Sequence, residues 1–331
     1  MTIQEEMKIT AESVNKYLFS FMSGDPKILY NASYHLIKSG GKRMRPFLTL
    51  KSCELFGGSE KIVLPVAAAV ELIHNFTLVH DDIMDDDNLR HGVPTVHIKY
   101  NLPTAILAGD VLFAASFQSV SKKFKDLGIS SDKAIKMVEI LADSSVTVCE
   151  GQTKDIMMAL DHEFHSSSDY FQMIEKKTAA LFETSCRLGS ISGGADQKDE
   201  ESLATFGRYF GIAFQMVDDV LGVVGEHKVT GKPVGGDILQ GKKTYIISLA
   251  LETVEESDRQ KILNIFGKKF TSQADVKTAI DILSSSGVAD VVRKKARSYA
   301  KMALENLSTF PDNSAKKSLF QMTDFMISRN L

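Results

Sequence analysis

Five aspartates fall within residues 81–87, directly after a long apolar segment. We expect this cluster at the end of a helix, where residues three or four positions apart share a face. Asp81 and Asp85 would then point in the same direction, with Asp82 beside them. Carboxylates presented in this way suit Mg²⁺, which commonly binds through one or two carboxylates plus substrate phosphates. A solvated acidic helix end is the alternative interpretation of this segment taken alone.

A second aspartate pair, Asp218 and Asp219, lies in the strongly apolar segment GIAFQMVDDVLGVV. Burying an unpaired carboxylate is costly, so aspartates in such a segment normally face a metal ion, a partner charge or a water-filled cavity. Gln215 precedes Asp218 by three residues and shares its helix face. Two acidic helix faces on opposite walls of a cleft would bracket Mg²⁺ ions and a polyphosphate.

Basic clusters complement the two aspartate motifs. The segment SGGKRMRP, residues 39–46, combines a glycine turn, three cations and a proline. This arrangement suits the binding of an anion through both backbone and side chains. Further cations are Arg90, Lys176, Lys177, Lys232, Lys242 and Lys243. Each alone would more often be a solvated patch, but together with two aspartate motifs they indicate a site for diphosphates.

Overall composition narrows the class of protein. A formal net charge of −3 argues against a generic nucleic-acid binder, which needs an excess of basic charge. The three cysteines are widely spaced, so neither a disulfide framework nor a CxxC metal site is predicted. The N-terminal residues lack the pattern of a signal peptide, and no run of about 18 uncharged apolar residues occurs. We expect a cytoplasmic protein without stable membrane insertion.

Helices are expected to position these residues. Apolar residues recur at three- and four-residue spacing, good helix formers are abundant, and alternating strand patterns are scarce. The predicted turns lie at residues 23–26, 39–41, 56–59, 161–168, 193–194, 231–241 and 284–287. No repeat or low-complexity linker divides the chain, and the motifs come from both halves. The sequence therefore predicts a single domain over residues 1–331.

The motifs GGKRMRP, DDIMD, KT, FQMVDD and a later GK…K resemble those of the trans-isoprenyl diphosphate synthases, in the same order and with similar spacing. The resemblance covers roughly residues 38–250. It implies an all-α fold, a single large bundle of long helices around a central cavity, usually assembled as a homodimer. It also implies condensation of isopentenyl diphosphate with dimethylallyl, geranyl or farnesyl diphosphate in trans, through Mg²⁺-assisted ionisation, condensation and proton elimination.

The same resemblance suggests which residues bind the allylic substrate and its metal ions. Asp81 and Asp85 look like the ligands of two Mg²⁺ ions and Asp218 like the ligand of a third, with Asp82 and Asp219 completing the metal-binding motifs. The cations that match the family's clamp on the allylic diphosphate are Arg90, Lys177, Lys232 and Lys242. Thr178 and Gln215 would lie near the carbocation that remains when that diphosphate leaves.

Isopentenyl diphosphate would bind at Lys42, Arg45 and His74, which match the family's site for this second substrate. Two departures from the family pattern affect these assignments. The family commonly has two arginines after the first aspartate motif, and here the second is His91, which carries at most a partial charge near neutral pH. A third aspartate is absent from the second motif, so the metal role there rests mostly on Asp218.

Product length is expected to depend on the residues one turn before Asp81. Thr77 lies four residues before Asp81 on nearly the same face, whereas Phe76 is rotated from it by about 100°. An aromatic residue at the fifth position before the aspartate, with a small residue at the fourth, resembles the archaeal-type geranylgeranyl diphosphate synthases. Farnesyl diphosphate or a longer product is the alternative, and Phe76 could also be an ordinary core residue.

Three other functions compete with this interpretation. A non-catalytic prenyl synthase subunit usually lacks one aspartate motif, and both are present. A terpene cyclase or head-to-head condensing enzyme generally lacks the GGKRMRP site for a second diphosphate. An HD-type phosphohydrolase would use His80 and Asp81 together as metal ligands, but that leaves Asp218 and Asp219 without a role.

Overall fold

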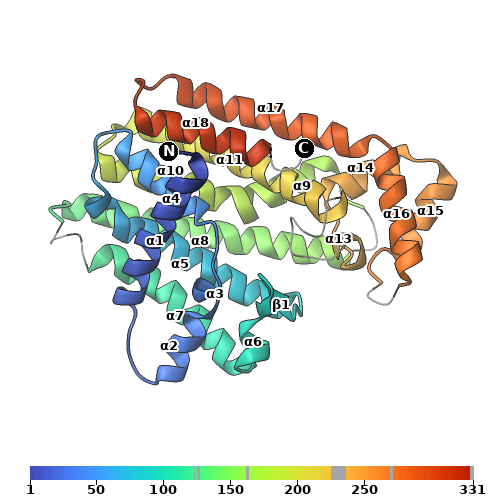
Figure 1. Ribbon diagram of the computed structural model, residues 1–331, viewed down its shortest axis with the longest axis horizontal. Helices are drawn as coiled ribbons and strands as arrows, with labels where there is room; N and C mark the ends of the chain where they lie inside the picture. Colours follow the sequence, from blue (N-terminus) through green and yellow to red (C-terminus); the bar gives the residue numbers. More distant parts are fainter. Residues whose placement is uncertain (123, 125–126, 162–163, 225–235, 269–270, 329–331) are drawn as a thin grey trace. The chain divides into compact units, whose positions relative to one another are not determined.

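The computed structural model of the protein describes residues 1–122, 124, 127–161, 164–224, 236–268 and 271–328. Within these ranges the chain is almost entirely helical, and the only strands are β1 (Leu89–Arg90) and β2 (Val93–Pro94), which pair antiparallel. The predicted all-α fold class is confirmed. Figure 1 shows the helices with the labels used below.

The chain forms two compact units, each assembled from segments that are distant in sequence. Unit 1 comprises Met1–Val146, Leu181–Gly207 and Asn306–Met322. Unit 2 comprises Thr147–Ala180, Arg208–Glu305 and Thr323–Leu331. Because the chain passes between the units several times, neither corresponds to one half of the sequence. The single domain expected over residues 1–331 stays a prediction.

Unit 1 contains the N-terminal helices. They are α1 (Ile3–Phe21), α2 (Lys27–Ser33), α3 (His35–Lys38), α4 (Met44–Glu54), α5 (Glu60–Met84), α6 (Val96–Lys99) and α7 (Leu102–Ser121). Nearly all of α10 (Ala180–Gly193) also belongs to it. The boundary between the units falls inside α8 (Ser131–Leu160), α11 (Gln197–Val224), α17 (Val288–Ser308) and α18 (Ser314–Ile327).

Unit 2 contains shorter helices between these long ones. They are α9 (Ser167–Ile174), the π-helix η1 (Glu175–Ala179), α13 (Gly236–Leu239), α14 (Tyr245–Thr253), α15 (Glu256–Ile265) and α16 (Gln273–Ser285). An aromatic group joins three of the helices, since Tyr170 of α9 stacks on Tyr245 of α14 with ring centroids 5.7 Å apart. Phe171 contacts Tyr299 of α17 at 5.7 Å. The ring of Tyr170 is thereby held in place and buried.

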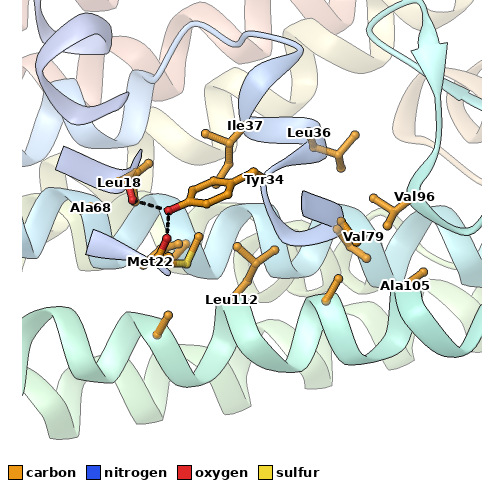
Figure 2. Packing of buried hydrophobic residues seen from close by; sticks show 14 of the residues in the cluster. Leu18, Met22, Tyr34, Leu36, Ile37, Ala68, Val79, Val96, Ala105 and Leu112 are labelled. Carbon is orange, nitrogen blue, oxygen red and sulfur yellow. Dashed lines mark hydrogen bonds between the residues drawn. The ribbon is translucent and has the colours of Figure 1, made fainter. Parts of the chain in front are cut away.

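The core of unit 1 forms around α5, which packs along α4 and α7. Figure 2 shows side chains of α1, α5 and α7 converging, with Leu18, Ala68 and Leu112 fully buried. Burying a leucine stabilises the fold by about 1.5–3 kcal/mol. The Tyr34 hydroxyl donates hydrogen bonds to the carbonyls of Leu18, at 2.8 Å, and of Met22. The packing fixes the helix that ends in the first aspartate motif.

Two helices of unit 1, α5 and α7, are long and apolar enough by length and composition to cross a membrane. In α5, 67% of the apolar window is buried within the protein. This degree of burial is typical of a core helix, so the apolar character of α5 is explained by packing. In α7 the buried share of the window is 44%, and Ile106 and Leu107 are exposed.

Candidate active site

The first aspartate motif lies at the C-terminal end of α5, as the sequence predicts. Asp81 is in the last turn, and Asp85 caps the helix with its N–H donating to the carbonyl of Asp81 at 2.8 Å. Both side chains are partly exposed. One helical turn therefore separates two carboxylates that share a face and remain open to solvent.

Asp82, between them in sequence, has a different environment. Its side chain is fully buried, and its Oδ1 accepts a hydrogen bond from Nε of Arg90 at 2.6 Å. Arg90 belongs to β1, whose short hairpin with β2 returns it to the end of α5. This ion pair holds the first clamp cation beside Asp81 and Asp85.

The glycine turn before α4 has the backbone geometry that its sequence implies. Gly40 and Gly41 have φ angles of +106° and +141°, a region that residues with a Cβ rarely adopt. Lys42 is exposed, and the guanidinium of Arg45 lies 4.2 Å from the ring centroid of Phe182. The two basic residues predicted to bind isopentenyl diphosphate therefore flank the start of α4.

Arg43, the third cation of this loop, is buried, unlike Lys42 and Arg45. Arg43 is 5% exposed, and its Nη1 donates to Oε1 of Glu71 at 2.7 Å. Its Nε donates to Asn15 at 3.0 Å and its Nη2 to the carbonyl of Ile37 at 2.7 Å. Arg43 consequently ties the loop to α5 and α1, which leaves Lys42 and Arg45 as the loop's candidate anion-binding residues.

His74 of α5 lies within range of a group of positive charges. Burial lowers the pKa of His74 well below 6.5, and the charges of Arg45, Arg43, Arg90 and His91 lower it further. Its imidazole is therefore neutral near pH 7. The structure thus brings together Arg45, His74, Arg90 and His91, which the sequence assigned to diphosphate binding.

The two residues expected to limit product length lie one turn before Asp81. Phe76 is partly buried, with its ring 4.8 Å from that of His80 and 5.1 Å from that of Phe113 on α7. Thr77 is partly buried as well, and its hydroxyl donates to the carbonyl of His74 at 2.8 Å. Phe76 is thus part of an aromatic contact between α5 and α7.

The second aspartate motif, on α11 in unit 2, also contains one exposed and one buried carboxylate. Asp218 is exposed, whereas Asp219 is 6% exposed and accepts hydrogen bonds on both oxygens. The Tyr170 hydroxyl donates to Oδ2 at 2.5 Å, and Nε2 of Gln215 donates to Oδ1 at 2.7 Å. Oε1 of Gln215 in turn accepts from the Thr178 hydroxyl at 2.8 Å.

Burial is the largest influence on Asp219 and raises its pKa to about 7. The nearby carboxylates of Asp237 and Asp218 add to this increase, while the hydrogen bonds from Tyr170 and Gln215 act in the opposite direction. Desolvation disfavours the charged form of an acid, whereas donors to its oxygens favour that form. The hydrogen bonds therefore retain part of the anionic character that burial opposes.

The KT motif occupies the π-helix η1, a rare geometry that is frequent at functional sites. Lys177 forms an ion pair with Asp155 of α8, and Thr178 is buried. The backbone of η1 approaches α8 so closely that a Cβ on Gly151 would lie 2.2 Å from the amide nitrogen of Lys177. A glycine is therefore required at position 151.

The two remaining clamp cations are Lys242 and Lys232. Lys242 is partly exposed, with Nζ 4.0 Å from Oδ1 of Asp237. Lys232 lies outside the described residues. Unit 2 thus presents Lys177, Lys242 and Asp218, while unit 1 presents Arg90, Asp81 and Asp85.

The donor set fits Mg²⁺ better than a metal that requires a complete protein cage. Among the described residues, no group of three or more Asp, Glu, His or Cys side chains could hold a metal ion. Mg²⁺ keeps several waters and commonly uses one or two carboxylates plus substrate phosphates. Carboxylates that reach solvent beside cations are the arrangement that such shared coordination requires.

Comparison with protein-family models matches residues 26–283 to the family described as Polyprenyl synthetase. The chain belongs to the polyprenyl synthetase family. It is 41% identical to a geranylgeranyl diphosphate synthase of Sulfolobus acidocaldarius over 324 residues, which cover 96% of each chain. The predicted resemblance and the prediction of a prenyltransferase are confirmed.

Other polyprenyl synthetases extend this result. The chain is 39% identical to a geranylfarnesyl diphosphate synthase of Aeropyrum pernix, covering 96% of this chain and 99% of the relative. A polyprenyl synthase of Caulobacter crescentus, solved with calcium and isoprenyl diphosphate, superposes with a TM-score of 0.89 at 32% identity, covering 99% of this chain and 97% of that one. The isoprenoid synthase fold is confirmed.

Several residues of this polyprenyl synthetase that contact the candidate site were not identified from the sequence. Tyr170, Asp155 and Glu71 bind candidate site residues or the loop that carries them, but each stands alone in its segment. The signal that could have suggested Tyr170 is its spacing, since it precedes Lys177 by two helical turns. The inserted residue of a π-helix disturbs that periodicity, so spacing alone would not have sufficed.

Proposed function

We propose that this polyprenyl synthetase condenses isopentenyl diphosphate with dimethylallyl, geranyl and farnesyl diphosphate in trans and releases geranylgeranyl diphosphate. One observation carries the proposal: unit 1 presents carboxylates suited to a metal-bound diphosphate at the end of α5 and a separate basic group at the start of α4. Asp81 and Asp85 form the first feature. Lys42 and Arg45 form the second, and Arg45 lies within electrostatic range of His74 on α5. A condensation of two diphosphates requires two such sites, whereas a cyclase or a phosphohydrolase binds one substrate.

The allylic diphosphate would be held by residues of both aspartate motifs and by the clamp cations. Asp81, Asp85 and Asp218 would hold three Mg²⁺ ions, and the partly exposed clamp cations Arg90, Lys177 and Lys242 would bind the same diphosphate, together with Lys232. When bound, Mg²⁺ would stabilise the negative charge that develops on the leaving diphosphate. For Asp82 and Asp219, the contacts described above favour support of neighbouring side chains over direct coordination.

Isopentenyl diphosphate would bind through Lys42, Arg45 and His74, with His91 nearby. Since its own C–O bond stays intact, these residues only have to position its double bond next to the allylic carbon. Holding two reactants in the right geometry supplies a large part of the rate enhancement. Thr178 and Gln215 would place oxygen atoms near the allylic cation, and the departing diphosphate would remove the final proton.

Phe76 and Thr77 are the residues that would set the product length at geranylgeranyl diphosphate. The contact of Phe76 with Phe113 supports a wall across the growing chain, with the smaller Thr77 leaving more room beside it. The Sulfolobus acidocaldarius relative is named for the geranylgeranyl product. The Aeropyrum pernix relative is named for geranylfarnesyl diphosphate, so this longer product is the nearest alternative.

We further propose that the enzyme works in the cytoplasm as a homodimer. Helix α7 supports the second statement, because Leu102, Ile106 and Leu107 expose 49%, 42% and 55% of their surface. Burial of such side chains against a second copy would remove apolar area from water. Light scattering of the purified protein measures the mass directly, and a monomer would contradict the dimer.

The test is an assay with purified protein, labelled isopentenyl diphosphate, each allylic primer in turn, and Mg²⁺. Chromatography of the dephosphorylated products should show geranylgeraniol as the end product, with no turnover when Mg²⁺ is chelated. Release of a hydrocarbon would instead support a cyclase, and phosphate release from a nucleotide without isopentenyl diphosphate would support a phosphohydrolase. Inactivity with every primer would support a non-catalytic subunit.

A further inference from the structure

We propose that Tyr170 and Asp219 are positioning residues that fix the orientation of the Gln215 amide, and through it the hydroxyl of Thr178. The proposal rests on the proposed function, since it concerns how the same enzyme stabilises an allylic cation. It assigns Asp219 to the support of a side chain and leaves Asp218 as the metal ligand of the second motif.

The chain of hydrogen bonds is continuous and lies within unit 2. It runs from the Tyr170 hydroxyl to Asp219, from the Gln215 amide to the other oxygen of Asp219, and from the Thr178 hydroxyl to the Gln215 carbonyl. Tyr170, Asp219 and Thr178 are 2%, 6% and 7% exposed. Buried polar groups of this kind favour a single arrangement of hydrogen bonds. Any other arrangement would leave a buried donor or acceptor without a partner, which costs free energy.

The chemistry of the donors sets the direction of each bond. Both oxygens of Asp219 act as acceptors, one from the Tyr170 hydroxyl and the other from Nε2 of Gln215, so the end of the Gln215 side chain that faces Asp219 is the NH₂ group. The amide oxygen therefore faces Thr178, whose hydroxyl proton is directed to that oxygen. The partner of the Thr178 hydroxyl is then a carbonyl oxygen and not an N–H group. This polarity suits the neighbourhood of a carbocation, because N–H protons there would repel it.

Aromatic contacts hold the Tyr170 ring, which anchors this series of hydrogen bonds. The Tyr170 ring stacks on Tyr245 with planes 25° apart and contacts Phe171 with ring centroids 5.3 Å apart. Two aromatic neighbours restrict the ring, so its hydroxyl reaches Asp219 without a large loss of side-chain freedom. Successive residues of an α-helix are rotated by about 100°, which directs Asp218 outward while Asp219 points into unit 2.

Two conservative variants test the role. Tyr170→Phe removes one donor and should slow the single-turnover condensation about tenfold, equivalent to ~1.4 kcal/mol. Asp219→Asn should slow it about a hundredfold, the size of effect seen when a preorganised dipole is lost. The substituted side chain has one oxygen in place of two, so it can no longer accept hydrogen bonds from Tyr170 on one side and from Gln215 on the other. Combining both changes should cost no more than Asp219→Asn alone, because the two residues act on one amide.

The dependence of the rate on Mg²⁺ concentration distinguishes a positioning role of Asp219 from direct coordination of a metal ion. In both variants the Mg²⁺ concentration for half-maximal rate and the Michaelis constants for both diphosphates should stay within about twofold of wild type. If Asp219 is instead a metal ligand, Asp219→Asn will raise the Mg²⁺ requirement and Tyr170→Phe will have no effect. The matched control is Tyr245→Phe, which removes a hydroxyl from the ring stacked on Tyr170 and should keep the wild-type rate.

A second readout does not depend on substrate turnover. In protein labelled with ¹⁵N-glutamine, the Gln215 side-chain amide signal, assigned by its loss in Gln215→Met, should shift in Tyr170→Phe and Asp219→Asn but not in Tyr245→Phe. Unchanged signals with unchanged rates in both variants would overturn the inference. Inactivity of the wild-type protein would overturn the proposed function, while the shift of the amide signal would still be measurable.

Discussion

Neighbouring aspartates have different environments in both aspartate motifs. Asp81 and Asp218 reach solvent, while Asp82 and Asp219 are buried and each accept a hydrogen bond from another candidate site residue. The rotation of about 100° between successive helical residues accounts for this division. The sequence predicted the carboxylates and their place on helices. It could not distinguish the two environments, since that depends on which elements pack against α5 and α11.

Asp81→Ala and Asp218→Ala should each lower the condensation rate by at least about a thousandfold, because a lost metal ligand removes transition-state stabilisation worth several kcal/mol. Rates measured at saturating Mg²⁺ and substrates check this, with circular dichroism to confirm folding. The control is Asp86→Asn, in the same acidic cluster. Asp86 has a φ of +55°, a conformation that asparagine tolerates, so this variant should stay active.

The neutral state of His74 leads to a prediction about stability. The folded protein holds the pKa of His74 well below 6.5, so the unfolded chain takes up a proton first as the pH falls. Since the unfolded state then binds more protons, the free energy of unfolding should decrease below about pH 6.5, by up to ~1.4 kcal/mol per pH unit. Above that pH this contribution is fully retained.

Urea unfolding at several pH values between 8 and 5.5 measures this dependence. A His74→Gln variant lacks the titrating group, so its stability should fall less steeply over the same range. Parallel curves for the two proteins would show that His74 does not carry the effect. The comparison of slopes is used because the substitution itself changes stability at every pH.

At the level of elements, the positions of turns and helices were predicted better than the contacts between residues distant in the sequence. The glycine turn at residues 39–41 and the helix ending at the first aspartates were predicted, because glycine conformation and apolar periodicity are local properties. The π-helix η1 was not, since the residue types of Glu175–Ala179 do not distinguish it from an α-helix. The burial of Arg43 was also missed, because its partner Glu71 is 28 residues away in sequence.

Gly151→Ala tests the close approach of α8 to η1. The new methyl group would lie 2.2 Å from the backbone nitrogen of Lys177, so the backbone must shift. Overpacking of this kind typically costs about 1–3 kcal/mol, and the shift should displace Lys177 and Thr178. We expect a lower melting temperature together with a reduced condensation rate.

Thr153→Ala, on the same helix at an exposed position, is the control and should change neither quantity appreciably. If Gly151→Ala retains the wild-type rate, the geometry of η1 is not needed to position Lys177 and Thr178. A lower melting temperature alone would then reflect packing without a link to the site.

The contact between α5 and α7 predicts how product length changes. Phe76→Ala would open space beside Phe113, so longer products should accumulate. Thr77→Phe adds a ring on the side nearer Asp81 and should shorten the product towards farnesyl diphosphate. Chromatography of the dephosphorylated alcohols measures both. Identical lengths in wild type and both variants would place the limit on chain growth elsewhere.

At the scale of the whole molecule, the candidate site residues are distributed over two interleaved units. The order of the motifs in the sequence predicted the family, and that prediction is confirmed. The division into units was not predicted, because each unit combines three segments that are separated in the sequence by 17 to 98 residues. Chain contacts of this range depend on the packing of long helices, which a local pattern does not encode.

The proposed use of both aspartate motifs by one diphosphate predicts a joint effect of metal and ligand on stability. Mg²⁺ alone or inorganic diphosphate alone should raise the melting temperature little, since neither completes the coordination. Together they should raise it substantially, because a ligand present at about a hundred times its dissociation constant stabilises the folded state by about 2.7 kcal/mol. Scanning calorimetry measures the change in melting temperature.

Asp81→Ala, in unit 1, and Asp218→Ala, in unit 2, should each lose most of this increase in melting temperature, whereas Asp86→Asn should retain it. A full increase in either alanine variant would mean that one aspartate motif binds the metal–diphosphate complex without the other.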